Sequence, residues 1–242
     1  STSSGASANT MQYGSNISGY NNIQYHLPAD LLPLGMGAKI GYVPNTADGD
    51  SNDFKNSGGT NAQGVDGDSL VQYQLTAAPI DGLKIGADYY ETGGNKLSTV
   101  SQNKSGGNVY AQYSYGNFKF GAYKGKLEPS KTTDKHASAS ADTATALNGD
   151  RYESDGIGIE FAVNDQLSVS FTEEDFERTN KTMAATASTN SRATVTSSQT
   201  TIMAAYNIGG ATVGVSLIDT DNSDYTDGRE ENKTVFSLAL AF

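Results

Sequence analysis

The sequence of 242 residues contains no cysteine and no tryptophan, and its basic residues are few. Without cysteine, a disulfide framework, a thiolate metal site and a cysteine nucleophile are all excluded. The chain has 16 Lys and Arg against 27 Asp and Glu, a formal net charge of -11. Nucleic-acid binding requires a basic face that meets the phosphates, so we expect no nucleic-acid partner.

Long apolar runs are also missing from the sequence. No run approaches the roughly 20 residues that a membrane helix needs. A signal peptide and an initiator Met are absent as well, so we expect a processed or truncated chain. Only 36% of the residues are hydrophobic, a content also found in disordered proteins, but 14 Tyr and 8 Phe recur along the chain at regular intervals. That regularity favours a folded protein.

Period-two alternation of apolar and small or polar residues takes the place of helical periodicity along most of the chain. In the final segment, Phe236, Leu238, Leu240 and Phe242 share one face, and Ser237 lies on the other. Strands of about 9–11 residues suffice to span a bilayer at a tilt. The alternation predicts eleven strands, at 22–28, 34–43, 69–77, 82–91, 108–115, 118–127, 152–163, 166–176, 199–208, 211–220 and 233–242.

The connections between these strands alternate in length. One set is short, as at 116–117, 164–165 and 209–210, and contains the Gly, Asn and Asp that tight hairpins prefer. The other set is long and polar, at 44–68, 92–107, 128–151, 177–198 and 221–232. Membrane barrels show this asymmetry between periplasmic turns and external loops. The pattern predicts an all-β, transmembrane, antiparallel up-and-down β-barrel that forms a single domain over 1–242.

A soluble β-sandwich binding domain is the alternative fold, because its strands alternate in the same way. Aromatic residues near the strand ends favour the membrane barrel, whose interfacial girdles are aromatic, although the lack of Trp is a mild point against it. These residues are Tyr25, Tyr42, Tyr73, Tyr89, Tyr113, Tyr115 and Tyr206.

An odd number of strands conflicts with the even counts of bacterial single-chain barrels, in which both termini are periplasmic. Residues 1–20 are rich in Ser, Gly and Asn and are predicted to form a loop, with only a weak strand signal near Thr10–Tyr13. We therefore expect that N-terminal strands precede this sequence in the complete protein.

Three segments carry a resemblance to a known family: SLVQYQLTAAPIDGLKIGADYYETGG, AAYNIGGATVGVSLIDTDNSD and the ending TVFSLALAF. Over residues 15–242 the chain resembles the C-terminal two-thirds of a Gram-negative general diffusion porin of the alphaproteobacterial kind. The resemblance implies a barrel of sixteen strands in the outer membrane, a homotrimer, and residues 1–20 as the tail of the loop that narrows the pore. It also implies that Phe236, Leu238, Leu240 and Phe242 form the signal read by the outer-membrane assembly machinery; an ordinary edge strand is the alternative.

Alternation directs a set of polar and charged side chains toward the barrel interior, where we expect them to line the pore. Lys39, Lys84 and Lys119 lie at similar heights and suggest a basic strip, although they would equally serve to keep the wall hydrated. The predicted pore-lining residues are Gln24, His26, Lys39, Lys84, Asp88, Lys119 and Glu160.

Catalysis is not expected. His26 and His136 have no nucleophile or acid at a recognisable spacing. The acidic run Glu173-Glu174-Asp175 resembles a glycosidase carboxylate pair, but we favour solvated carboxylates at the base of a loop, without a catalytic role.

The segment 219–231 is rich in carboxylates, and oxygen ligands suit Ca²⁺. A solvated acidic loop is the favoured interpretation; loosely bound Ca²⁺ and cross-bridging of lipopolysaccharide phosphates by divalent ions are the alternatives. No other cofactor is expected. The weak metal-ligand candidates are Asp219, Asp221, Asp224 and Asp227.

The function expected from these features is a water-filled pore for passive diffusion of small hydrophilic solutes and ions. The alternatives are a surface adhesin or phage-receptor barrel, and a substrate-specific channel with an aromatic ladder, for which inward Tyr90, Tyr110 and Tyr123 are too few. Because most acids lie in the predicted external loops, we expect weak selectivity with a modest cation preference that shrinks as salt rises.

Overall fold

The computed structural model describes residues 22–28, 31–44, 69–93, 100–129, 131–132, 151–182 and 191–240. At 100–102, 131–132, 180–182 and 191–193 it describes the backbone alone. The described residues form strands joined by turns, with a short 3-10 helix, η3, at Ser223–Tyr225. The strands are β1 Ile23–His26, β2 Gly37–Val43, β3 Leu70–Ala77, β4 Leu83–Thr92, β5 Val100–Gln102, β6 Ser105–Tyr115, β7 Phe118–Glu128, β8 Lys131–Thr132, β9 Arg151–Ala162, β10 Leu167–Thr182, β11 Ser191–Ile208, β12 Ala211–Asp221 and β13 Glu231–Leu240.

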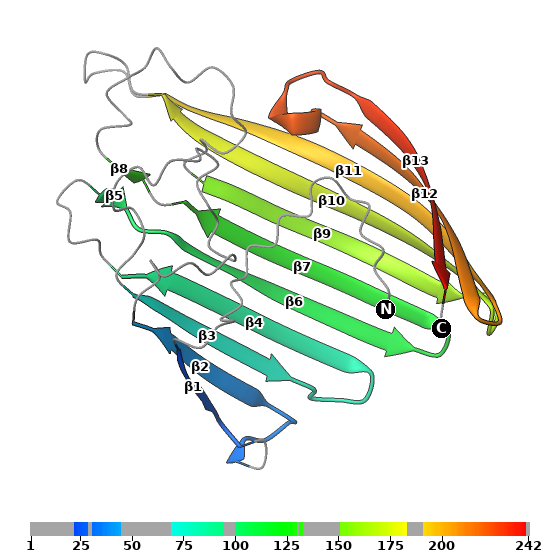
Figure 1. The fold of residues 1–242 in the computed structure, drawn as a ribbon, viewed down its shortest axis with the longest axis horizontal. Helices are drawn as coiled ribbons and strands as arrows, with labels where there is room; N and C mark the ends of the chain where they lie inside the picture. Colours follow the sequence, from blue (N-terminus) through cyan, green and yellow to red (C-terminus); the bar gives the residue numbers. More distant parts are fainter. Residues whose placement is uncertain are drawn as a thin grey trace.

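Eleven strands form one curved antiparallel sheet in the order β1-β2-β3-β4-β6-β7-β9-β10-β11-β12-β13, and β5 pairs separately with β8 (Figure 1). Each strand of the large sheet pairs with the strand next to it along the chain, apart from the small β5 and β8. The predicted all-β, up-and-down architecture of eleven antiparallel strands is confirmed. Among the described residues β1 and β13 do not pair with each other, so the sheet is open, and the closed sixteen-stranded barrel stays a prediction.

The short turns form where the sequence predicts them, and their backbone conformations explain the residues found there. Gly116 and Gly209 open two-residue turns with φ of 55° and 61°, a left-handed conformation that glycine adopts without steric cost. At the β3–β4 turn, Gly82 has φ of 78°, and a Cβ there would lie 2.3 Å from the Ser114 carbonyl oxygen. In the β9–β10 turn the Asn164 side chain accepts hydrogen bonds from the backbone N–H groups of Gln166 and Leu167. Local chemistry therefore fixes this end of the sheet.

The long-loop end differs from the sequence-based expectation. The predicted loop at 177–198 is wrong, because β10 and β11 continue to Thr182 and back from Ser191 with unbroken pairing. The β-branched residues of this hairpin suit extended backbone, and the hydroxyls of Thr179 and Thr194 lie 3.2 Å apart across it. The predicted loops 92–107 and 128–151 likewise contain β5 and β8.

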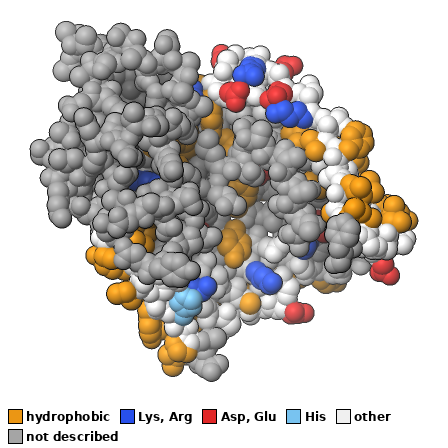
Figure 2. All heavy atoms as spheres, viewed as in Figure 1, with side chains coloured by type: hydrophobic (Ala, Val, Ile, Leu, Met, Phe, Trp, Pro, Cys, Tyr) orange, Lys and Arg blue, Asp and Glu red, His pale blue; other side chains and the backbone are white. Residues whose placement is uncertain are grey.

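The two faces of the large sheet differ in composition and in exposure. We call the face that carries Phe236 and Leu238 the outward face, and the opposite one the inward face. Phe236 is 79% exposed and Leu238 64% exposed. The buried side chains of the strands lie mostly on the inward face near the long-loop end, as the strand registers place them. Figure 2 shows hydrophobic side chains along the lower left and right margins of the sheet.

Candidate pore-lining face

The strand registers bring the predicted pore-lining residues to one face. Directly opposed residues in an antiparallel pair point to the same side of a sheet. One such row runs from His26 to Lys39, on to Gln74 and Asp88, and ends at Asn108. Gln24 and Lys84 are an even number of residues from members of this row, so they share its face. Lys119 and Glu160 pair with each other, and Lys119 also opposes Ser114, which is an even number of residues from Asn108.

One ion pair and two side-chain contacts link polar residues of this face. The Lys119 Nζ lies 3.2 Å from the Glu160 Oε2, with the two side chains 35% and 41% exposed. The Asn108 amide donates to the Asp88 carboxylate at 3.3 Å, and His26 Nε2 lies 3.1 Å from Gln24 Oε1. Lys39 and Lys84 are exposed and have no ion pair among the described residues. Each of the three lysines lies within the first three residues of its strand, so any basic strip lies at the short-turn end.

Two inward tyrosines lie over glycines of the neighbouring strand. A Cβ on Gly86 would lie 2.4 Å from the ring of Tyr110, and a Cβ on Gly156 would lie 2.7 Å from the ring of Tyr123. The Tyr123 hydroxyl donates a hydrogen bond of 2.8 Å to Glu174. The glycines leave room for these rings directly above the backbone of the sheet, so the aromatic side chains project less into the space beside it.

The acidic run 173–175 does not form a loop base. All three residues lie within β10, where Glu173 opposes Ile157 and Glu174 opposes Gly156. Strand alternation therefore separates the carboxylates: Glu174 points inward, to Tyr123, and Glu173 and Asp175 point outward. The run falls inside the predicted strand 166–176, but it does not border a loop, because β10 continues to Thr182.

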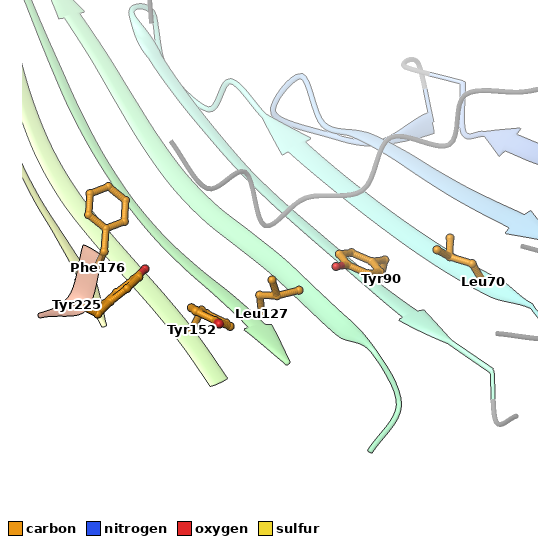
Figure 3. Close-up of a cluster of buried hydrophobic side chains, with 6 residues drawn as sticks. All are labelled: Leu70, Tyr90, Leu127, Tyr152, Phe176 and Tyr225. Carbon is orange, nitrogen blue, oxygen red and sulfur yellow. The ribbon is translucent and has the colours of Figure 1, made fainter. Parts of the chain in front are cut away.

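An apolar cluster crosses the inward face near the long-loop end (Figure 3). We call it the inward apolar cluster; its members are Leu70, Tyr90, Leu127, Tyr152, Phe176 and Tyr225, all 9% exposed or less. Sequence reasoning missed it, although Leu127 and Phe176 are large apolar residues at inward positions. Tyr225 gave no signal, because it lies between two strands and reaches the cluster only through the path of the β12–β13 connection.

The four aspartates proposed as calcium ligands do not form one site. Asp219 and Asp221 lie on β12 at positions that oppose the outward Thr200 and Ser198. Asp224 lies in η3, where its carboxylate is 2.7 Å from the Arg229 guanidinium. Within the described ranges, no three acidic or histidine side chains gather as metal ligands would.

The predicted assembly-signal residues lie on the outward face as far as they are described. Phe236, Leu238 and Leu240 are 79%, 64% and 53% exposed, and they oppose Val215, Val213 and Ala211 of β12. Phe242 and His136 lie outside the described residues. The seven tyrosines predicted for the interfacial girdle share the outward face as well, by the same registers. That the outer-membrane assembly machinery recognises this C-terminal segment stays a prediction.

The described part of the chain contains no helix that is long and apolar enough to cross a membrane.

The sequence matches neither a protein-family profile nor a curated protein. The fold, in contrast, matches solved porins. The anion-selective porin from Comamonas acidovorans superposes with a TM-score of 0.60 at 12% identity over 91% of this chain and 59% of that one. A porin refined at 1.8 Å resolution gives 0.54 at 10% identity over 92% and 64%. OmpF from Salmonella typhi, in a complex with daunomycin, gives 0.55 at 11% identity over 90% and 62%.

This chain therefore spans about 59–64% of the length of these three porins. At such low identity the likeness establishes the fold. The matched sheet, with its apolar outward face and polar inward face, shows that this chain has the fold of the Gram-negative general porins.

Proposed function

We propose that the protein forms a water-filled pore in the outer membrane of a Gram-negative bacterium, for passive diffusion of small hydrophilic solutes and ions. The observation that carries this proposal is the division of one sheet into an exposed apolar face and a polar face. A Lys directed at lipid near the bilayer midplane costs roughly 2–4 kcal/mol. The same side chain directed at water in a pore costs little, and its charge influences which ions pass.

Weak selectivity fits the charges of the inward face. Lys119 is compensated by Glu160, and Asp88 lies on the same face as the unpaired Lys39 and Lys84. The wall is therefore close to neutral, and a modest cation preference would come from acids in the external loops. Exposed charges of that kind are screened beyond about 8–10 Å at physiological salt.

The rival channel and surface functions find less support. A substrate-specific channel would need a continuous aromatic ladder, whereas Tyr110 and Tyr123 lie close over glycines and Tyr90 is buried in the inward apolar cluster. An adhesin or phage receptor would act through its loops and needs no polar inward face. Porins are channels, and the similarity to them supports a protein that is not an enzyme.

Homotrimer formation, contact with lipopolysaccharide and insertion by the outer-membrane assembly machinery are part of this proposal. An apolar outward face with exposed aromatic residues is what contact with lipid, or with a second subunit within the membrane, requires. The ending Phe236-Ser-Leu238-Ala-Leu240 supports recognition by the assembly machinery through its alternation.

Planar-bilayer recording of the full-length protein, extracted in detergent from the envelope of cells that produce it, tests the pore. The expected result is stepwise insertion of channels whose current is proportional to voltage and is not blocked by added sugars. Current that saturating sugar blocks would indicate a substrate-specific channel instead. Membrane insertion without conductance would reject the pore in favour of a surface receptor.

A further inference from the structure

The connection between β12 and β13, residues 222–230, folds over the inward face instead of extending away from the sheet. Tyr225 of this segment is 9% exposed. Its ring lies beside that of Tyr152 on β9 (Figure 3), edge-on, with the two centroids 6.1 Å apart. The Arg178 guanidinium carbon on β10 lies 4.9 Å from the Tyr225 centroid. Strands β10 and β11 separate β9 from β12, so Tyr225 spans three strand spacings, about 14 Å.

Specific hydrogen bonds hold the segment in this position. The Asn222 amide donates to the Thr196 carbonyl at 2.9 Å, and its own oxygen accepts from the Gly228 N–H at 2.8 Å. The Ser223 hydroxyl donates to Glu231 at 2.8 Å. Asn222 and Tyr225 have φ of 51° and 56°, a left-handed conformation that is uncommon for residues with side chains and persists only where surrounding contacts enforce it.

Exposed charges cover the other side of this segment. Asp224 and Arg229 form an ion pair of 2.7 Å with side chains 55% and 53% exposed, and Asp227 and Glu230 are exposed as well. One side of the segment thus packs on the inward apolar cluster, and the opposite side offers charges to solvent.

We propose that residues 222–230 form a strap that narrows the long-loop mouth of the pore, and that Tyr225 is its anchor on the wall. The inference rests on the proposed pore, because the inward face borders water only if the protein conducts. Within that pore the strap reduces the open cross-section and places charged groups where solutes enter, so it restricts bulky and apolar solutes more than small ions.

Single-channel recording of three variants of the full-length protein tests the strap. Tyr225→Ala removes the anchor, Tyr225→Phe keeps the ring, and Thr226→Ala changes an exposed neighbour in the same segment. Because conductance depends on pore diameter, we expect Tyr225→Ala to raise it roughly 1.3-fold or more, with noisier open levels, and the other two variants to match the wild type. Replacement of residues 222–230 by a two-residue turn should raise conductance at least as much.

A titration that needs no channel tests the anchor separately. Burial and the neighbouring Tyr152 raise the pKa of Tyr225 from 10.0 to about 12, and the Arg178 guanidinium partly opposes that shift. The tyrosinate absorbance of the wild type minus that of Tyr225→Phe should therefore rise near pH 12. A rise near pH 10, or channels whose conductance is the same in the wild type, Tyr225→Ala and the shortened variant, would overturn the strap and leave the pore standing. A wild type that forms no channels would overturn the proposed function, and the strap with it.

Discussion

The outward and inward faces of this sheet are made from alternate residues of the same strands, yet they differ in which side chains are exposed and which are buried. On the outward face Ile, Leu, Val and Phe are exposed, as Phe236 and Ile157 show with 79% and 59% exposure. On the inward face Ser197 and Gln199 are buried at 1% and 4% exposure. In the proposed membrane barrel, the exposed apolar side chains of the outward face would gain stability from contact with lipid and not from a dry core between two layers. The difference teaches that the two faces of one sheet can be built for two different surroundings by alternate residues of the same strands.

Introducing a charge on one face and then on the other should give the largest difference in stability between the two faces. Leu75 and Gln74 are adjacent on β3, both exposed, and point to the outward and inward face respectively. We expect Leu75→Arg to destabilise the folded protein by up to about 2–4 kcal/mol, the cost at the bilayer midplane, because the guanidinium meets lipid. Gln74→Arg should change stability little, since it meets water and lies opposite Asp88.

Urea unfolding of both variants in phospholipid vesicles, followed by far-UV circular dichroism, measures the difference. Equal free energies of unfolding for the two variants would break the comparison, because the two faces would then contact the same medium.

Glycines on the inward face offer a smaller, purely steric test. A Cβ on Gly156 would lie 2.7 Å from the Tyr123 ring and 3.1 Å from the Glu173 carbonyl oxygen, whereas one on Gly121 would meet nothing within 4 Å. We expect Gly156→Val to cost about 1–3 kcal/mol through overpacking and to break the Tyr123–Glu174 hydrogen bond.

The matched control, Gly121→Val, should be close to neutral in the same unfolding measurement. If Gly121→Val proves as costly as Gly156→Val, the inward face is crowded throughout. The interpretation that tyrosine rings occupy the room left by glycines, beside an open space, would then be wrong.

The smallest effect concerns the ion pair on the inward wall. Glu160→Gln leaves Lys119 uncompensated, so the reversal potential in a salt gradient should shift toward anions, and Lys119→Gln should shift it toward cations. The change in stability should stay below about 1 kcal/mol, because both partners are partly exposed.

Reversal potentials measured from about 0.01 to 1 M salt separate the effect of the wall charges on selectivity from that of the external-loop charges. Over this range the screening length falls from about 30 to 3 Å. We expect the wild-type cation preference to shrink as salt rises. A strong anion preference that persists at high salt would assign the selectivity to Lys39 and Lys84.

Much of the wall could be predicted from the sequence, because its causes are local. The alternation of Lys84, Gly86 and Asp88 with Leu83, Ile85 and Ala87 assigns faces without knowledge of any partner strand, and Gly82, Gly116 and Gly209 mark turns where positive φ is needed. The strand ends were less predictable at the long-loop end. There Thr and Ser suit a loop and an extended strand alike, and pairing decides between them, as with Thr179 and Thr194.

The sequence by itself determined an antiparallel up-and-down sheet, two chemically distinct faces, and the sharing of one face by residues such as Lys39, Asp88 and Lys119. Only the tertiary structure decided which inward charges pair, since Lys119 and Glu160 lie far apart in the chain and meet through the β7–β9 register. It alone placed Tyr225 against Tyr152, across two intervening strands, and against Arg178, across one. The reason is physical: a side-chain direction follows from the local backbone period, whereas the path of a connection depends on the distant surfaces on which it packs.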